Sequence, residues 1–400
     1  MRAVVMRDAG LVVDEVPVPA LQPGQVLAEV LACGICGADL HALAHADRMV
    51  EMSELTSEPG GIAPRIMDPN HDVVMGHEFS ARVLEVGDNV GNCAPGDVVV
   101  SLPIVMDAGG IHAVGYSNDY PGGYAEQLVL SDMLTMKVPN GLHPELAALT
   151  EPMAVAWHAV RRSEIARKDV AIVIGCGPVG LAVICLLKAR GVKTVVASDF
   201  SPGRRALAQR CGADVVIDPA TTSPWSNWQE YGFMGGLGDL LELALGTREK
   251  LAKLPLPWWH VWRLAEALGQ NPARPVIFEC VGVPGLLQQL IDGAPLLSRV
   301  VVAGVCMQVD RIEPAVAIHK EIDLRFVFGH SPLEFRDTLH LIADGKVDCA
   351  PLITGVVGLD GVANAFDALK DPERHAKILI DPASAATRPL ASAPARAHAP

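Results

Sequence analysis

The chain has 400 residues, which is long for a single domain and predicts two or three domains. Its 46 acidic and 32 basic residues give a formal net charge of −14, which argues against a nucleic-acid-binding protein because such a protein needs a basic face. Half of the residues are hydrophobic but only 4% are aromatic, which excludes a disordered chain and predicts a large aliphatic core.

The N-terminus lacks the long apolar run of a secretory signal peptide. The nine cysteines follow no regular framework, which indicates a reduced protein, and we expect a cytoplasmic location. Residues 170–187 carry no charge and have the length of a membrane span, but three glycines and a proline interrupt them. We interpret this stretch as a strand, a tight turn and a buried helix, and we expect no membrane partner.

Short valine-rich runs separated by glycine and proline fill residues 1–150. This spacing predicts a β-rich domain with many turns, and we place it at residues 1–152. The predicted strands are Ala3–Met6, Gln25–Ala32, Ala81–Val86, Asp97–Leu102 and Ala125–Leu130.

From residue 153 to 328 the pattern changes to alternating strands and helices, which predicts right-handed crossovers and a parallel sheet. Ser201 and Pro202 are typical of a helix start. The predicted strands are Val170–Ile174, Thr194–Ser198, Asp214–Ile217, Val276–Val281, Arg299–Val305 and Asp323–Phe328. Residues 329–382 add a helix and a strand that return to the first domain. Residues 383–400, rich in Ala, Pro and Ser, are predicted to be disordered.

A glycine-rich segment between a predicted strand and a predicted helix is typical of a dinucleotide site. Its candidate cofactor-binding residues are Gly175, Gly177, Pro178, Val179 and Gly180. Asp199 ends the next strand, where a carboxylate accepts hydrogen bonds from the ribose and repels a 2′-phosphate. This favours NAD over NADP, although Arg204 and Arg205 follow closely. A glycine turn without a ligand is the alternative interpretation.

Residue types that bind zinc occur in three separate segments. The candidate ligands are Cys36 in GICGADLH, His77 and Glu78 in GHE, and Glu151 before the nucleotide domain. A thiolate, an imidazole and a carboxylate suit a catalytic zinc ion with an open coordination position. Taken singly, Cys36 also fits a buried small hydrophobe, His77 a core histidine and Glu151 a helix-start carboxylate. Cys33 and Cys36 do not indicate a zinc ribbon, because the chain has no second CxxC pair.

These segments resemble the zinc-dependent medium-chain dehydrogenase/reductase family of alcohol, sorbitol and threonine dehydrogenases. The resemblance covers about residues 1–218 and 275–382 and rests on GICGADLH, GHE followed by VLEVGDNV, GDVV, GGYAE, EPMAVAWHAV, and GCGPVG with DFSP. It implies an α/β fold with a GroES-like β-rich catalytic domain and a Rossmann nucleotide domain with a doubly wound parallel sheet. It also implies NAD(H)-dependent oxidation of a small-molecule alcohol, or the reverse carbonyl reduction, by a homodimer or homotetramer.

The resemblance also implies roles for the matching residues. The implied zinc ligands are Cys36, His77, Glu78 and Glu151, with the two glutamates alternating in one position. Asp39 would orient the zinc-binding imidazole, and His41 would be the relay histidine near the ribose. The residues that would border the nicotinamide are Gly282, Gly304 and Val305.

Two departures from the family pattern alter these implications. Ala38 stands where the family usually has a serine or threonine that passes on the alcohol proton, and alanine can neither donate nor accept it. A water, a substrate hydroxyl, Glu78 or Glu151 would have to take the proton instead. The four-cysteine lobe that often holds a structural zinc is also missing, since residues 102–122 contain no cysteine. We therefore expect one catalytic zinc and no structural zinc.

Two segments are longer than their family counterparts. We interpret Met49–Asn70 as an inserted loop. The larger insertion, residues 219–274, holds five of the six tryptophans: Trp225, Trp228, Trp258, Trp259 and Trp262. One predicted helical face comprises Trp258, Val261, Trp262, Ala265 and Leu268. A helical excursion, an oligomer contact and a lid over a bulky apolar substrate are the alternatives for this insertion.

Zinc-dependent, NAD-dependent oxidation of an alcohol is the leading hypothesis, with secondary, bulky and cyclic alcohols as the substrates to test first. A metal-free NADPH-dependent enone or quinone reductase of the same fold is one alternative, but it would not need the four candidate ligands. A non-catalytic nucleotide-binding or interaction protein is the other, and only Ala38 and the tryptophan-rich insertion favour it.

Overall fold

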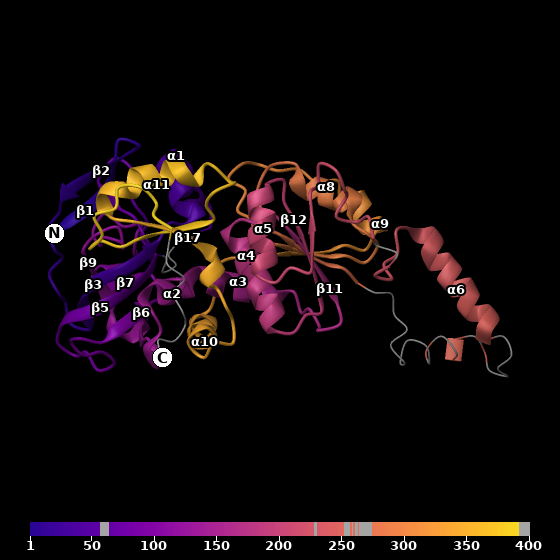
Figure 1. The fold of residues 1–400 in the computed structure, drawn as a ribbon, viewed down its shortest axis with the longest axis horizontal. Coiled ribbons are helices and arrows are strands. Elements are labelled where there is room, and N and C mark those ends of the chain that lie inside the picture. Colours follow the sequence, from indigo (N-terminus) through magenta and orange to yellow (C-terminus); the bar gives the residue numbers. More distant parts are fainter. Residues whose placement is uncertain are drawn as a thin grey trace. The chain divides into compact units, whose positions relative to one another are not determined.

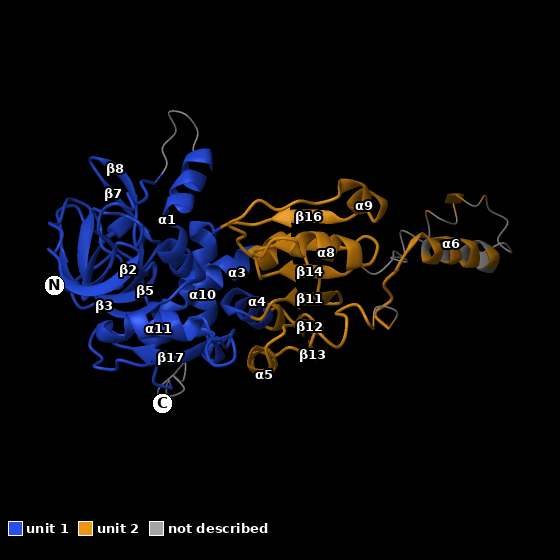
Figure 2. Ribbon diagram, turned by 90° about the horizontal axis from the view of Figure 1, so that it is seen from above, with its two compact units in different colours: residues 1–158, 177–186, 329–400 blue, residues 159–176, 187–328 orange. Residues whose placement is uncertain are grey.

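The computed structural model describes residues 1–56, 64–227, 230–251, 257, 259–260, 263 and 274–391. The chain forms two compact units, which Figure 2 shows in different colours. Unit 1 comprises residues 1–158, 177–186 and 329–400, and unit 2 comprises residues 159–176 and 187–328.

Unit 1 is rich in β-structure, as Figure 1 shows. Its largest sheet has seven strands in the order β10-β6-β5-β3-β18-β17, with β9 also paired to β3. These strands are β3 (Gln25–Gly34), β5 (Glu78–Val86), β6 (Val98–Ser101), β9 (Gln127–Ser131), β10 (Thr135–Lys137), β17 (Ile353–Val357) and β18 (Lys377–Ile380). Strands from both ends of the chain therefore share one sheet.

Two smaller sheets complete the strands of unit 1 in the described part of the chain. One has the order β2-β1-β4, with β1 (Arg2–Arg7), β2 (Gly10–Glu15) and β4 (Val73–Val74). The other is the hairpin of β7 (Ile104–Asp107) and β8 (Gly110–Ala113). The core between these elements is mainly aliphatic, with Tyr124 and Phe366 in edge-to-face contact as an aromatic exception.

The helices that begin in or belong to unit 1 are α1 (Gly37–Thr56), α2 (Pro144–Ala148), α3 (Thr150–Arg162), α4 (Pro178–Ala189), α10 (Pro332–Ala343) and α11 (Val362–Leu369). The prediction of a loop from Met49 is wrong, because α1 continues to Thr56. The helix is kinked at His45, whose φ of −147° and ψ of 42° are not helical. Beyond this kink, Arg48 and Glu51 form an ion pair along the helix.

Unit 2 contains a six-stranded parallel sheet in the order β13-β12-β11-β14-β15-β16. Its strands are β11 (Val170–Ile174), β12 (Thr194–Ser198), β13 (Val215–Ile217), β14 (Val276–Glu279), β15 (Arg299–Val302) and β16 (Asp323–Phe326). Numbered from β11, this is the order 3-2-1-4-5-6 of a doubly wound nucleotide-binding fold, so the predicted fold class is confirmed. The helices α5 (Pro202–Arg210), α8 (Leu286–Gly293) and α9 (Pro314–His319) lie in the crossovers.

The tryptophan-rich insertion is described in part. It contains helix α6 (Leu237–Leu251), and Trp225 packs against the core of unit 2. Trp259 is about half exposed. Trp228, Trp258 and Trp262, and with them the predicted tryptophan face, lie outside the described residues.

The C-terminal residues 384–390 are ordered, in contrast to the prediction of disorder from residue 383. Leu390 and Val356 exchange two backbone hydrogen bonds of 2.9 and 3.0 Å, and Gly358 N–H donates to Ala386 at 2.8 Å. Backbone hydrogen bonds to β17 and Gly358 thus order this segment, although its sequence has no apolar periodicity. Residues 392–400 lie outside the described part.

In the part of the chain that the structure describes, no helix is both long and apolar enough to cross a membrane.

Candidate functional site

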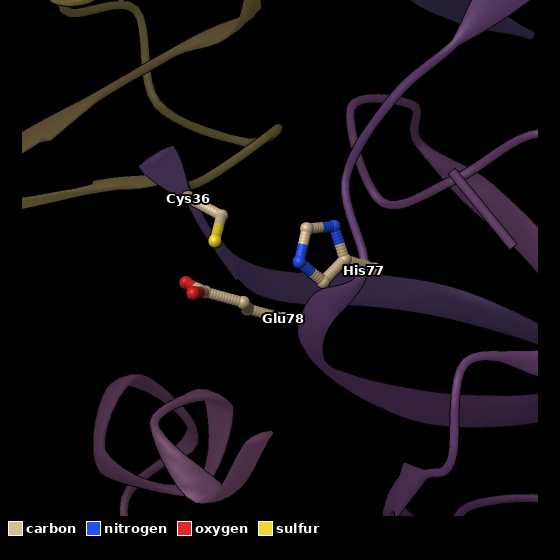
Figure 3. A group of neighbouring side chains, drawn as sticks. All are labelled: Cys36, His77 and Glu78. Atoms are coloured by element: carbon tan, nitrogen blue, oxygen red, sulfur yellow. The ribbon is translucent and has the colours of Figure 1, made fainter. Parts of the chain in front are cut away.

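Three of the four predicted zinc ligands come together in unit 1. The sulfur of Cys36, a ring nitrogen of His77 and a carboxylate oxygen of Glu78 all lie within 4.8 Å of one another. Cys36 lies in the turn between β3 and α1, His77 directly precedes β5, and Glu78 is its first residue. Figure 3 shows the three side chains directed toward one another. Sulfur, nitrogen and oxygen donors in a mostly buried group fit a zinc ion.

Glu78 is held by a buried lysine that the sequence analysis did not single out. Lys377, the first residue of β18, places Nζ 2.7 and 2.6 Å from the two carboxylate oxygens, and donates a third hydrogen bond to Ile35 O at 3.0 Å. The strands β5 and β18 flank β3, and Gly34 of β3 pairs with Glu78. A side chain at Gly34 would overlap the Glu78 carboxylate, so this glycine makes room for the ion pair.

Asp39 contacts His77 on the side of the ring that faces away from Cys36 and Glu78. Its Oδ1 lies 3.4 Å from His77 Nδ1, which leaves the other ring nitrogen facing Cys36 and Glu78 (Figure 3). Asp39 is fully buried and accepts hydrogen bonds from the backbone N–H of Cys36 and from the hydroxyls of Tyr116 and Tyr124. A carboxylate in this place orients a metal-binding imidazole and fixes which nitrogen is free to bind.

Buried charges shift the pKa values of this group. Burial raises the pKa of the Cys36 thiol, and Glu78 adds to the rise. Burial alone would lower the pKa of His77, but Asp39 and Cys36 raise it well above its ordinary value. Likewise, burial alone would lower the pKa of Lys377, but Glu78 and Cys36 together raise it overall. A bound cation would favour the thiolate and displace the imidazole proton, which couples metal binding to proton release.

Glu151 is not part of the three-residue group. It lies in the first turn of α3, and its Oε1 is 3.6 Å from Nε2 of His330, another residue that the sequence analysis missed. Burial raises the pKa of Glu151, but the hydrogen bond with His330 and the nearby positive charges lower it overall. Both side chains are largely buried.

The predicted relay residue, His41, lies on α1. His41 is half-buried, and burial together with the charge of His45 lowers its pKa. Ala38 lies one helical turn before it and presents only a methyl group.

In unit 2 the glycine-rich turn directly follows β11. Gly175 has a φ of +89°, which favours glycine, and a side chain there would come within 2.5 Å of Val281. Asp199 lies just after β12 and accepts hydrogen bonds from the N–H groups of Cys176 at 2.7 Å and Ser201 at 2.8 Å. The Ser201 hydroxyl in turn accepts the N–H of Arg204, so the predicted helix start is confirmed. This network fixes the Asp199 carboxylate beside the turn.

The ends of β14 and β15 are held together by Glu279, which the sequence analysis also missed. Its carboxylate accepts the N–H groups of Val281 and Gly282, and its carbonyl accepts that of Gly304. Gly282 has a φ of +72°, and a side chain there would meet the backbone of Val305 at 2.6 Å. The three residues predicted to border the nicotinamide thus lie in one closely packed group of backbone at this edge of the sheet.

Comparison with known proteins agrees with both halves of this description. Residues 22–140 match the family model of the alcohol dehydrogenase GroES-like domain, and residues 178–247 match that of the zinc-binding dehydrogenases. The chain is 31% identical to (R,R)-butanediol dehydrogenase of Bacillus subtilis (strain 168), over 92% of this chain and 96% of that protein.

This chain belongs to the zinc-dependent medium-chain dehydrogenase family. Among solved structures, 2R,3R-butanediol dehydrogenase from Bacillus subtilis has a TM-score of 0.70 and 29% identity, and the match covers 95% of this chain and 99% of that one. A zinc-binding dehydrogenase from Sinorhizobium meliloti 1021, bound to NADP, has the same TM-score at 24% identity, with the same coverage of both chains, and shows the fold alone.

Family membership makes the chain a zinc-dependent oxidoreductase that acts on alcohols with a nicotinamide cofactor. Sequence reasoning missed the residues that contact the predicted site residues. They are Lys377, His330, Tyr116, Tyr124 and Glu279. A charged residue at the head of the apolar run KILI was a usable signal for Lys377, because a strand interior rarely tolerates an unpaired charge. His330 and Glu279 carry no local signal of this kind.

Proposed function

We propose that this dehydrogenase oxidises a secondary alcohol with a polar neighbouring group, using NAD and one zinc ion per chain. Cys36 and His77 would hold the ion together with a carboxylate from Glu78 or Glu151. The observation that carries the proposal is the group of sulfur, nitrogen and oxygen donors within 4.8 Å, backed by Asp39.

When bound, the zinc ion supplies a Lewis acid that polarises the substrate oxygen, and NAD supplies the hydride acceptor. Asp39 keeps the ring of His77 in one orientation. Lys377 holds both oxygens of Glu78 and offsets one negative charge next to the Cys36 thiolate. Because the site is then less negative, it stabilises the negatively charged alkoxide that forms when the bound alcohol loses its proton.

The alcohol proton cannot pass through residue 38, because alanine has no polar atom. We assign its acceptance to the carboxylate of Glu151, with Nε2 of His330 as the next acceptor at 3.6 Å from Oε1. This route would replace the hydroxyl step that the family usually has, and it leaves His41 without its usual partner in the relay.

NAD rather than NADP is proposed as the cofactor on the basis of Asp199. Its carboxylate is fixed by two backbone N–H groups beside the turn, and a fixed negative charge there repels a 2′-phosphate. The neighbouring Arg205 does not offset this repulsion, because it donates to the carbonyl oxygens of Asp199 and Phe200 and pairs with Asp218.

The proposed substrate class rests on the names of the relatives. They include butanediol dehydrogenases, an erythritol/L-threitol dehydrogenase of Mycolicibacterium smegmatis and L-threonine 3-dehydrogenases, whose named substrates all carry a second polar group near a hydroxyl. We therefore propose vicinal diols as substrates ahead of bulky and cyclic alcohols. The tryptophan-rich insertion is the one feature that favours the bulky and cyclic alcohols. A homo-oligomer paired through the edge of the unit 2 sheet is also part of the proposal.

The test combines metal analysis with turnover. The purified protein is expected to contain about one zinc per chain and to form NADH from vicinal diols faster than NADPH. The Cys36→Ser variant is expected to lose both zinc and turnover, whereas Cys349→Ser, in a buried cysteine outside the site, should keep both. A wild-type protein with little zinc, or a Cys36→Ser variant with unchanged turnover, would contradict the proposal.

A further inference from the structure

Residues 102–122, named here the hairpin lobe, form a small unit with a polar core. The lobe contains the β7–β8 hairpin and the turn that follows it. His112 at its centre is only 2% exposed, with Nε2 3.2 Å from Asp107 and Nδ1 3.6 Å from Asp119. The ring of Tyr120 contacts His112 edge-on, and its hydroxyl donates to Asp107 at 2.9 Å. Polar contacts thus organise the lobe, which contains no cysteine.

The lobe is held against the segment from β4 to the start of β5, which carries His77. Gly115 and Gly122 of the lobe pack against Gly76, the residue before His77. A Cβ atom on either glycine would come within 3.0 Å of the Gly76 backbone. Gly122 N–H also donates to Val74 O at 2.8 Å, and Gly123 N–H donates to Gly76 O at 2.8 Å. A shift of the lobe would therefore move the backbone next to His77.

One side chain of the lobe reaches the metal site itself. Tyr116 donates its hydroxyl to Asp39 Oδ1 at 2.9 Å, and its ring centroid lies 5.2 Å from that of His77. The same Oδ1 is the atom that faces His77 Nδ1. The other oxygen, Oδ2, accepts from Tyr124 at 2.7 Å and from Cys36 N–H at 2.9 Å.

We propose that Tyr116 is a positioning residue for the metal centre and that the hairpin lobe acts through it. Tyr116 fixes the one oxygen of Asp39 that orients His77 and also lies against the ring of His77. Without the Tyr116 hydroxyl, Oδ1 loses this hydrogen bond, and the oxygen that faces His77 is less firmly fixed. This lobe, which contains no cysteine, would then contribute to catalytic zinc binding through hydrogen bonds. This inference rests on the proposed zinc site.

The test compares two tyrosines of the same lobe. Tyr116→Phe is expected to weaken zinc binding about tenfold, the usual effect of losing a group that supports a metal ligand. Zinc affinity is measured by competition with a chelator, and the visible spectrum of the Co²⁺-substituted protein reports the ligand geometry. Tyr120→Phe is the matched control: it removes a hydroxyl bound to Asp107 and should lower thermal stability, but it should change zinc affinity and the Co²⁺ spectrum less than Tyr116→Phe does.

A double-mutant cycle with Asp39→Asn separates positioning from general destabilisation. Tyr116→Phe should have no further effect on zinc affinity once Asp39 is replaced, and Tyr124→Phe should have a smaller effect than Tyr116→Phe because Cys36 N–H still holds Oδ2. Equal losses in Tyr116→Phe and Tyr120→Phe, or additive losses in the cycle, would overturn the inference. A wild-type chain that binds no zinc would overturn the proposed function as well, whereas zinc-binding wild type with an unaffected Tyr116→Phe would overturn this inference alone.

Discussion

The residue that most shapes the metal site is one without a side chain. Gly34 lies in β3 between β5 and β18, and its missing Cβ lets Glu78 and Lys377 meet from opposite sides. The resulting ion pair is only 1% exposed on either side chain. A buried pair of this kind costs desolvation energy, so it is weak evidence for stability but constrains both partners.

Replacing Lys377 should therefore be far more harmful than replacing an exposed lysine. Lys377→Met leaves the Glu78 carboxylate buried and unpaired, and we expect a loss of about 3–5 kcal/mol in the free energy of unfolding. Urea unfolding of the metal-free protein measures it. Adding Glu78→Gln to Lys377→Met should recover part of the loss. Lys346→Met, in the exposed pair with Asp344, should cost less than about 1 kcal/mol, and equal losses in the two lysine variants would refute the argument.

The sequence indicated the proposed zinc ligands but not the groups that hold them. Cys36, His77 and Glu78 lie in short motifs, and their residue types are typical of metal ligands. Lys377 is 299 positions from Glu78, and Tyr116 is 77 positions from Asp39. Such contacts depend on strand order and register, which local patterns do not encode. Sequence reasoning also placed Glu151 with these residues; in the structure it lies outside the group of three and faces His330.

At the scale of elements, the apolar runs of unit 2 predicted all six strands of its sheet. The bounds of β11 and β12 agree with the prediction, whereas β14 and β15 end two and three residues early, at Glu279 and Val302. At this point the Glu279 carboxylate accepts the N–H groups of Val281 and Gly282, which therefore do not continue the ladder, and the Glu279 carbonyl accepts those of both Ala303 and Gly304. Apolar residues continue past this point, so composition alone could not place the strand ends.

Where β15 pairs with β16, Asp323 lies directly across from Arg299. Asp323 accepts from Arg299 Nε at 2.7 Å and pairs with Arg325 at 3.0 Å. Burial raises the pKa of Asp323, but the hydrogen bonds from Arg325 and Arg299 lower it overall. Since the folded-state pKa is lowered, the carboxylate stabilises the fold above its unfolded-state pKa, and this contribution disappears as the pH falls through the folded-state value.

Asp323→Asn should accordingly lower the free energy of unfolding at neutral pH by about 1.5–3 kcal/mol, the range for hydrogen bonds to charged groups. The difference from the wild type should begin to shrink as the pH falls through about 4, the ordinary pKa of an aspartate in an unfolded chain, and should vanish only below the lower pKa of folded Asp323. Urea unfolding at several pH values measures both. Asp337→Asn, in the exposed pair with Arg336, should show little effect at any pH. A difference that does not depend on pH would count against the assigned role of the charge.

At the scale of the whole molecule, the two ends of the chain meet in unit 1. The strands β17 and β18 join the sheet begun by β3, and residues 384–390 extend along β17. Unit 2, by contrast, ends its described sheet on β16, whose outer edge has no partner strand there. Phe326 on this strand is 65% exposed and Phe328 just beyond it is 92% exposed. Exposed apolar side chains beside an open strand edge are typical of a surface that pairs with another chain.

If a second copy of the chain pairs along β16, the purified protein should have at least twice the monomer mass in light scattering or sedimentation. A two-fold axis would place Phe326 and Phe328 of both copies in one apolar contact. The double variant Phe326→Asp/Phe328→Asp should then be monomeric, because it buries like charges against each other. Met133→Glu changes a similarly exposed apolar residue in unit 1 and should leave the mass unchanged. A wild-type monomer, or a double variant that still associates, would rule out this edge as the interface.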